Sequence, residues 1–159
     1  MHNTQQEVLR LLTQRGKSFS AAESCTGGLI AKMFTDLPGA SRAFVGGVVS
    51  YTNGVKHRVL GVPEEVLERC GAVSEPVAEA MARGVRHITG SDYAVSVTGL
   101  AGPEGDDRGN PVGTVFIGLA ACDGTEVVRL QRAGDREAGR QQAAEHAFAL
   151  LWRHLTENQ

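Results

Sequence analysis

The sequence predicts an α/β protein, a three-layer α/β/α sandwich with a mixed sheet, formed by one domain over residues 1–159. Short apolar segments alternate with longer segments whose apolar residues have helical spacing. This alternation favours a sheet covered by helices on both faces. The last two apolar segments are joined by a turn containing Asp123-Gly124, which is typical of a hairpin. At least one strand pair is therefore expected to be antiparallel.

Apolar segments of strand length mark the expected sheet. The segment from Phe44 to Tyr51 is rich in valine and aromatic residues, which favour strands, and the segment from Tyr93 to Thr98 is largely apolar. The predicted strands are 18–22, 44–51, 93–98, 113–121 and 126–131.

The expected helices have apolar residues three or four positions apart and recognisable ends. Thr4 can cap the first helix and Gly16 can end it. Pro63 stands near the first turn of the fourth helix, and Ser74 can cap the fifth. The predicted helices are 4–14, 26–36, 53–60, 63–69, 74–88 and 135–155.

Composition narrows the class of protein. The net charge of −2, with both signs mixed along the chain, argues against electrostatic binding of nucleic acid or of an anionic membrane. The three cysteines are widely spaced and form no CxxC pair, so neither a disulfide framework nor a zinc site is indicated. The N-terminus lacks an apolar signal core, and no apolar run approaches the ~18 residues of a membrane span. We therefore expect a reduced, cytoplasmic protein.

The most informative stretch is 22–31, Ala-Glu-Ser-Cys-Thr-Gly-Gly-Leu-Ile-Ala, where a strand should pass into a helix. Backbone N–H groups at a helix start favour developing negative charge, as acyl transfer requires. Ser24 and Cys25 are both candidate nucleophiles. A cysteine nucleophile usually needs a histidine, and no histidine here has an obvious partner, so Cys25 can equally be a small buried residue. For Ser24 the candidate base is Lys56, which burial could make neutral, although a solvated helix lysine fits the same pattern.

Two residues beside this pair have alternative interpretations. Tyr51 ends a predicted strand five residues before Lys56. It could orient the lysine or relay a proton, or it could simply fill the sheet edge. Glu23 precedes Ser24, and its side chain should point to the opposite face of the strand. There it could accept hydrogen bonds from backbone N–H groups near the turn, or it could be a structural buried carboxylate.

A loop and a helix face could contact a substrate. The loop 99–111 is long for a compact domain and follows a buried strand, at the edge where α/β sheets bind ligands. Arg136 and Arg140 lie four positions apart on the last predicted helix, so they could hold a phosphate together or belong to a solvated face. The acidic residues of the loop match no calcium-loop spacing, which favours a solvated loop over a metal site: Glu104, Asp106 and Asp107.

Six stretches, taken in order, resemble the CinA C-terminal domain family. They are 22–31, 51–53 with Lys56, 71–76, 98–103, 111–115 and 134–137 with Arg140. The resemblance covers nearly the whole chain. It implies a nicotinamide-nucleotide amidase, which hydrolyses the carboxamide of nicotinamide mononucleotide to nicotinate mononucleotide and ammonia. It also implies no metal, no cofactor and a homodimer or other homo-oligomer.

The resemblance assigns roles to particular residues. It implies Ser24 as the nucleophile and Lys56 as the general base, with Tyr51 near the pair. Oxyanion stabilisation would come from backbone N–H groups of Cys25 and its neighbours, and the loop after the third strand would grip ribose and phosphate together with Arg140. The residues expected to contact the oxyanion or substrate are Glu23, Cys25, Thr26, Gly27, Gly28, Thr98, Gly99, Gly102 and Arg140.

The chain departs from the family pattern at two places. Many members carry Glu-Arg-Gly where Val45-Gly46-Gly47 stands, and Ser-Asn-Glu-Ala-Lys where 52–56 reads Thr-Asn-Gly-Val-Lys. A carboxylate and an arginine are therefore missing. Two other functions stay open: a nucleotide-binding or interaction module that has lost efficient chemistry, and a hydrolase of another small amide.

Overall fold

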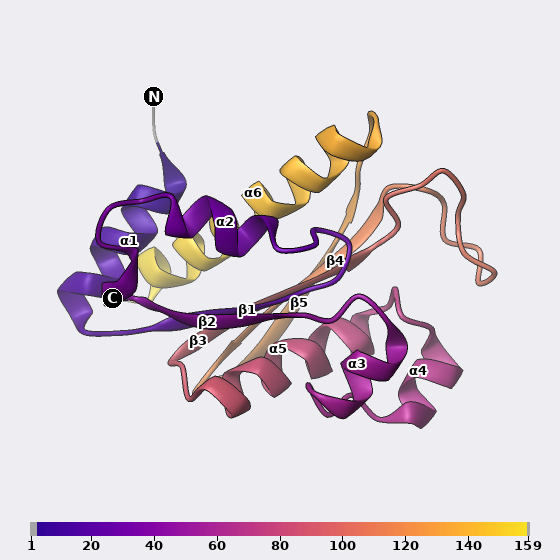
Figure 1. The fold of residues 1–159 in the computed structure, drawn as a ribbon, viewed down its shortest axis with the longest axis horizontal. Coiled ribbons are helices and arrows are strands. Elements are labelled where there is room, and N and C mark those ends of the chain that lie inside the picture. Colours follow the sequence, from indigo (N-terminus) through magenta and orange to yellow (C-terminus); the bar gives the residue numbers. More distant parts are fainter. Residues whose placement is uncertain (1–2, 159) are drawn as a thin grey trace.

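The computed structural model describes residues 3–158 and confirms the predicted fold class, a mixed sheet with helices on both faces (Figure 1). The strands are β1 (Phe19–Glu23), β2 (Phe44–Val49), β3 (Tyr93–Gly99), β4 (Thr114–Ala121) and β5 (Gly124–Gln131), in the spatial order β2-β1-β3-β4-β5. The helices are α1 (Thr4–Arg15), α2 (Leu29–Thr35), α3 (Asn53–Arg58), α4 (Glu64–Cys70), α5 (Glu75–Thr89) and α6 (Arg136–Glu157), with a short 3-10 helix η1 (Ala40–Arg42).

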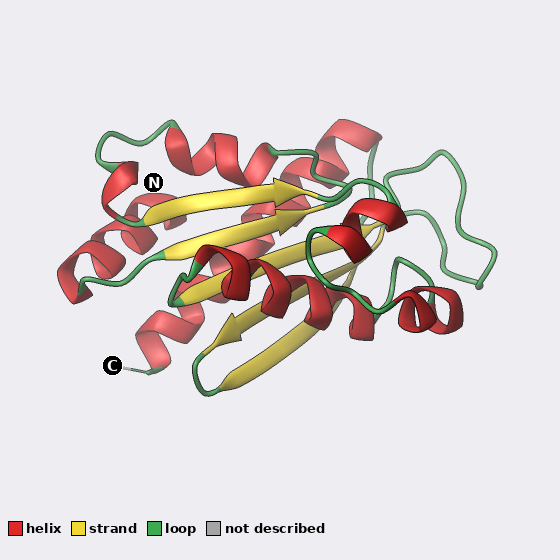
Figure 2. Cartoon of the chain, turned by 60° about the horizontal axis from the view of Figure 1, so that its bottom comes forward, coloured by secondary structure: helices red, strands yellow, loops and turns green. Residues whose placement is uncertain are grey.

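The helices divide into two layers. Helices α1, α2 and α6 cover one face of the sheet, and α3, α4 and α5 lie on the other (Figures 1 and 2). The α1–α2–α6 side contains a cluster of aromatic rings, with the centroids of Phe19 and Phe34 4.6 Å apart and Phe148 beside them. The α5 side has a smaller core around Val77 and Met81. Both faces of β1 are therefore buried, and its two polar residues, Ser20 and Glu23, are buried with them.

Several predicted boundaries are wrong by one to three residues; β2 ends at Val49 and α3 at Arg58, each two residues earlier than predicted. Glycine explains two other differences. Helix α2 begins at Leu29, not at Thr26, because Gly27 and Gly28 have φ values of 61° and 107° and form a turn in place of the first helical residues. Strand β5 begins at Gly124, which pairs with Ala121, so the hairpin connection is shorter than the predicted 122–125 segment. Gly124 has φ 138°, which lets the chain turn directly into the strand.

The topology positions the site. Strands β2, β1 and β3 are parallel, so their C-terminal ends meet at one edge of the sheet. Ser50 N–H donates to Glu23 O at 2.8 Å and Ser24 N–H donates to Val97 O at 2.9 Å, which extends the ladder one residue beyond each strand. Ser24 and Ser50 therefore emerge together at the edge where open α/β sheets bind ligands.

No helix among residues 3–158 combines the length and the apolar character that crossing a membrane needs.

Candidate active site

Ser24 and Lys56 meet at this edge. Ala22 faces the α5 core and Ala21 faces the α1–α2–α6 core, so alternation directs Ser24 toward the α3 side and Glu23 toward α2. Helix α3 begins after Thr52, whose hydroxyl accepts a hydrogen bond from Val55 N–H at 3.4 Å. One turn into this helix, Lys56 Nζ lies 3.0 Å from Ser24 Oγ. The two side chains are thus in direct contact although they are 32 positions apart in sequence.

The surroundings of Lys56 favour a neutral amine. Its side chain is 1% exposed, and burial lowers its pKa from 10.5 to about 8. Among residues 3–158 no carboxylate lies within ion-pair distance of it. Its other contacts are backbone oxygens, Ser50 O at 2.8 Å and Tyr51 O at 3.5 Å. A neutral amine can donate its two hydrogens to these carbonyls while its lone pair accepts the Ser24 proton.

Cys25 has the opposite electrostatic setting. Its side chain is buried, and burial raises the pKa of the thiol from 9.0 to about 11, against the smaller opposing effects of its own backbone N–H, Arg140 and Lys56. The thiol is therefore protonated near neutral pH. This arrangement fits a small buried residue and leaves Ser24, in contact with a nitrogen base, as the better-placed nucleophile.

Glu23 is buried on the α2 side, where its carboxylate accepts three hydrogen bonds. They come from the Thr26 hydroxyl at 2.7 Å, Ile30 N–H at 2.8 Å and Ala31 N–H at 3.1 Å. The free N–H groups at the start of α2 thus bind Glu23, whereas the sequence suggested that they would face the nucleophile. In the described chain, the N–H groups of Cys25 and Thr26 donate to no other residue. Cys25 is 8% exposed, whereas Thr26 is fully buried.

Arginines from the N-terminal end of α6 reach the same region. Arg140 donates from Nε to Cys25 O and from Nη2 to Thr26 O, both at 3.0 Å. Arg136 donates to Gly102 O at 3.0 Å and to the Tyr51 hydroxyl at 3.2 Å. Tyr51 is 59% exposed, and it contacts Lys56 through its backbone carbonyl. Neither arginine has a carboxylate partner within the described residues, so the charge of both is uncompensated.

The predicted loop residues have structural partners. The Thr98 hydroxyl donates to Ala72 O at 2.8 Å, which ties β3 to the segment before α5. A Cβ at Gly99 would lie 2.8 Å from Val115 Cγ2 and 3.2 Å from Cys25 Sγ, so this position has no room for a side chain. The acidic loop is not simply solvated, since Asp106 accepts hydrogen bonds from the backbone N–H groups of Arg108 and Asn110. No group of His, Cys, Asp and Glu in the described chain is arranged to hold a metal ion.

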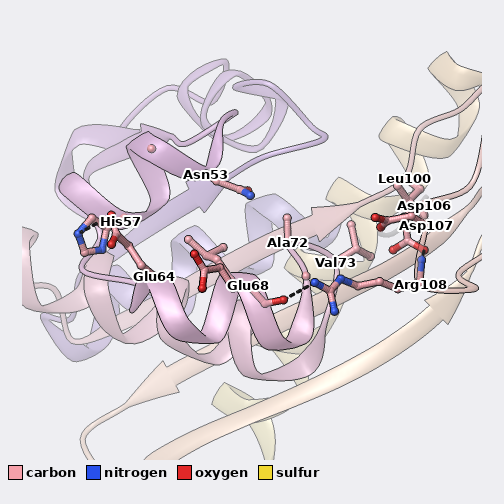
Figure 3. Close-up of a pocket in the computed structure, with 13 residues that line it drawn as sticks. Asn53, His57, Glu64, Glu68, Ala72, Val73, Leu100, Asp106, Asp107 and Arg108 are labelled. Carbon is pink, nitrogen blue, oxygen red and sulfur yellow. Dashed lines mark hydrogen bonds and ion pairs between the residues drawn. The ribbon is translucent and has the colours of Figure 1, made fainter.

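A cavity of about 640 Å³ lies between α3, α4 and this loop, on the side of the sheet that Ser24 faces (Figure 3). Asn53 lines it one turn before Lys56, and Leu100 lines it directly after β3. Arg108, from the loop, also lines the cavity, and its guanidinium donates to Arg69 O at 2.8 Å and to Glu68 O. Sequence reasoning missed Arg108 and Ser50, because both act through backbone carbonyls that no residue pattern identifies.

Of the two departures from the family pattern, the one at 52–56 lies on α3 beside Lys56, where Gly54 lines the cavity, and the one at 45–47 lies away from Ser24. Val45 is an exposed residue near the start of β2, followed by Gly46 at φ 151°. Both stand at the opposite end of this strand from Ser50.

A serine after a parallel strand and a buried lysine in contact with it form the candidate site of this α/β protein. The chain belongs to the CinA C-terminal domain family, whose model matches residues 1–155. Over nearly its full length it is a homologue of the nicotinamide-nucleotide amidohydrolase PncC of Enterobacter agglomerans, at 47% identity over 99% of this chain and 97% of that protein.

Longer relatives and solved structures agree with this placement. A putative competence-damage inducible protein of Desulforudis audaxviator is 53% identical over 82% of this chain. The chain spans only about a third of that relative, 32% of its length. A crystal structure of the competence damage-inducible protein A from Klebsiella pneumoniae subsp. pneumoniae superposes with a TM-score of 0.95 at 37% identity, covering 99% of this chain and 100% of that one.

Proposed function

We propose that this chain is a serine amidohydrolase that converts nicotinamide mononucleotide to nicotinate mononucleotide and ammonia, with Ser24 as the nucleophile and Lys56 as the general base. The observation that carries the mechanism is the 3.0 Å contact between Lys56 Nζ and Ser24 Oγ. The substrate is suggested by the name of the E. agglomerans relative, which aligns over 97% of its own length.

The reaction proceeds in two halves. Neutral Lys56 accepts the Ser24 proton while Oγ attacks the carboxamide carbon, and the negative charge on the carbonyl oxygen is bound by backbone N–H groups of Cys25 and its neighbours. Lys56 then gives its proton to the departing nitrogen, and ammonia leaves an acyl ester on Ser24. Water, deprotonated by Lys56, attacks this ester and releases the carboxylate product. Every step uses groups of the protein, the substrate and water.

The proposed substrate also matches the charge around the site. Its phosphate needs a positive partner, and the guanidinium groups of Arg136 and Arg140 face this edge without a carboxylate partner among residues 3–158. Arg140 retains one amino group, Nη1, that is not bound to the turn. The adjacent segment 99–102 contributes Leu100 to the cavity wall, and its two glycines, Gly99 and Gly102, add no side chain there.

Ammonia release from nicotinamide mononucleotide tests the proposal. We expect turnover by the wild type and, because Oγ is lost, none by Ser24→Ala, which should keep the fold as judged by circular dichroism. A panel of simple carboxamides run in parallel separates this activity from hydrolysis of another small amide. Binding of the nucleotide by the folded wild type without ammonia release would instead support the nucleotide-binding module.

A further inference from the structure

The nucleophile turn, residues 24–28, is held from the face of the sheet opposite to Lys56. Glu23 ends β1 and is 2% exposed, yet it forms no ion pair within the described chain. A buried carboxylate without a cation is costly unless it is well hydrogen-bonded. The three donors already described supply that compensation: the Thr26 hydroxyl, Ile30 N–H and Ala31 N–H.

Two of these donors make Glu23 a remote helix cap. Ile30 and Ala31 are the second and third residues of α2, the positions that a capping side chain normally satisfies. The N-cap residue, Gly28, has no side chain and cannot do this. Glu23 takes its place from across the turn, so one carboxylate joins the residue before Ser24 to the helix after the turn. The length and direction of the turn are thereby fixed at both ends.

Arg140 holds the same turn from α6. Its bonds to Cys25 O and Thr26 O engage two successive peptide groups. In a trans peptide the C=O and the following N–H point in opposite directions. Because Arg140 binds Cys25 O, the Thr26 N–H is directed away from α6, and Gly27 N–H, in the next peptide, is already donated to Ser24 O at 3.1 Å. Both peptide groups of the turn are therefore fixed in direction.

We propose that Glu23 and Arg140 are positioning residues that form a clamp with the Thr26 side chain, and that this clamp holds the nucleophile turn so that Ser24 Oγ and the Cys25 N–H keep their places during attack by Ser24. The proposal rests on the proposed function and gives Arg140 a role independent of the substrate phosphate. None of the three side chains needs to touch the reacting atoms. The clamp therefore acts on the rate of the chemical step and not on substrate affinity.

The test uses paired variants of Thr26. Thr26→Val removes the hydroxyl with little change in shape, and Thr26→Ser restores it. We expect Thr26→Val to lower kcat for nicotinamide mononucleotide about tenfold to a hundredfold, with KM within about twofold, because small misplacements of catalytic groups have effects of that size. Thr26→Ser should recover kcat to within about threefold of wild type. Equal kcat in Thr26→Val and wild type, or equal losses in both Thr26 variants, would overturn the clamp.

Arg140→Lys and Glu23→Gln test the other two members. A lysine keeps the charge but cannot bind two carbonyls as a guanidinium fork does, so kcat should fall about tenfold. A rise in KM with unchanged kcat would make Arg140 a phosphate ligand and contradict the positioning role. Glu23→Gln places an amide N–H against helix donors, and we expect kcat to fall at least about tenfold. The control is Ser96→Ala, which removes a buried hydroxyl bonded to Ala78 O at 2.6 Å and should leave kcat within about twofold.

A second readout separates this proposal from the substrate assignment. A fluorophosphonate phosphonylates an activated serine with loss of fluoride, and intact mass gives the labelling rate of Ser24 without any nucleotide. We expect the clamp variants to be slowed in the same order as in turnover, and Ser96→Ala to match wild type. If the wild type is labelled at Ser24 but releases no ammonia from nicotinamide mononucleotide, the substrate assignment is refuted. The labelling rates of the variants then decide whether the clamp exists. Wild-type labelling rates in all clamp variants, or a wild type that neither labels nor turns over, would refute the clamp.

Discussion

Lys56 is the residue whose protonation controls the proposed chemistry. Burial destabilises its charged form, and the carbonyls of Ser50 and Tyr51 hold its nitrogen against Ser24. The pKa of about 8 lies close to neutral pH, as an efficient general base requires. About a tenth of the amine is therefore neutral at pH 7 and about half at pH 8.

This protonation predicts the pH dependence of activity. Because only neutral Lys56 can accept the Ser24 proton, kcat/KM should rise with pH through about 8 and level off above it. Initial rates of ammonia release from pH 7 to 10 would measure the profile, and starting at pH 7 avoids the second ionisation of the substrate phosphate near pH ~6. A profile that is flat over this range, or that falls as pH rises, would contradict the assignment of Lys56 as the base.

Removing the amine should lower turnover strongly without unfolding the protein. Lys56→Met keeps a long apolar stem in a buried site and loses the base, so we expect kcat to fall by about 10² to 10⁴. Arg58→Met, on the same helix two residues later, serves as the matched control, since Arg58 is exposed. Comparable activity in Lys56→Met and wild type would mean that another group removes the proton.

At the level of elements, α5 packs so closely against the segment between α3 and α4 that some positions on α5 have no room for a side chain. Gly84 lies on α5 where a Cβ would be 2.0 Å from Leu60 O. Gly139 on α6 has no atom within 4 Å of its Cβ position. The two glycines thus differ in packing although both are in helices.

Alanine substitutions should separate these two cases. Gly84→Ala forces α5 away from Leu60, and we expect the free energy of unfolding to fall by about 2 kcal/mol even though alanine is the better helix former. Gly139→Ala gains helix propensity without a clash and should raise the free energy of unfolding by about 0.5 kcal/mol. Urea denaturation at constant pH measures both. A Gly84→Ala variant as stable as wild type would show that the close approach relaxes freely.

The elements also separate what the sequence can predict from what it cannot. Alternating apolar segments and the Asp123-Gly124 turn were sufficient for the layers and the mixed sheet, because burial on two faces leaves a strong pattern. The start of α2 was mispredicted because helical apolar spacing continues through Leu29 and Ile30, while Gly27 and Gly28 set the backbone of the turn. The partners of Lys56 and Arg140 are largely backbone carbonyls, which every residue has, so no sequence pattern identified them.

For the whole molecule, the buried lysine links activity to stability. The fold places an amine in a site that is 1% exposed, at the junction of the sheet and α3. Its pKa is about 8 in the folded protein and about 10.5 when the chain is unfolded. Below pH 8 both states bind the proton, and the folded state bears the cost of a buried charge. Between pH 8 and 10.5 the unfolded state binds more protons, so this residue makes the free energy of unfolding rise with pH in that window.

Comparison of Lys56→Met with wild type isolates this contribution. At pH 7 the variant avoids the buried charge and should be more stable, by at most about 3 kcal/mol, which is the upper limit set by the pKa difference. The difference should shrink as pH rises from 8 toward 10.5, because wild-type Lys56 is then neutral in the folded state. Urea denaturation of both proteins at pH 7, 8.5 and 10 measures it, and taking differences cancels the titration of other lysines and tyrosines. A constant difference, or one that grows with pH, would mean that folding does not depress the pKa of Lys56. The expected result would show that burying Lys56 lowers the free energy of unfolding of the whole protein. A single apolar substitution would then restore that stability while removing the activity.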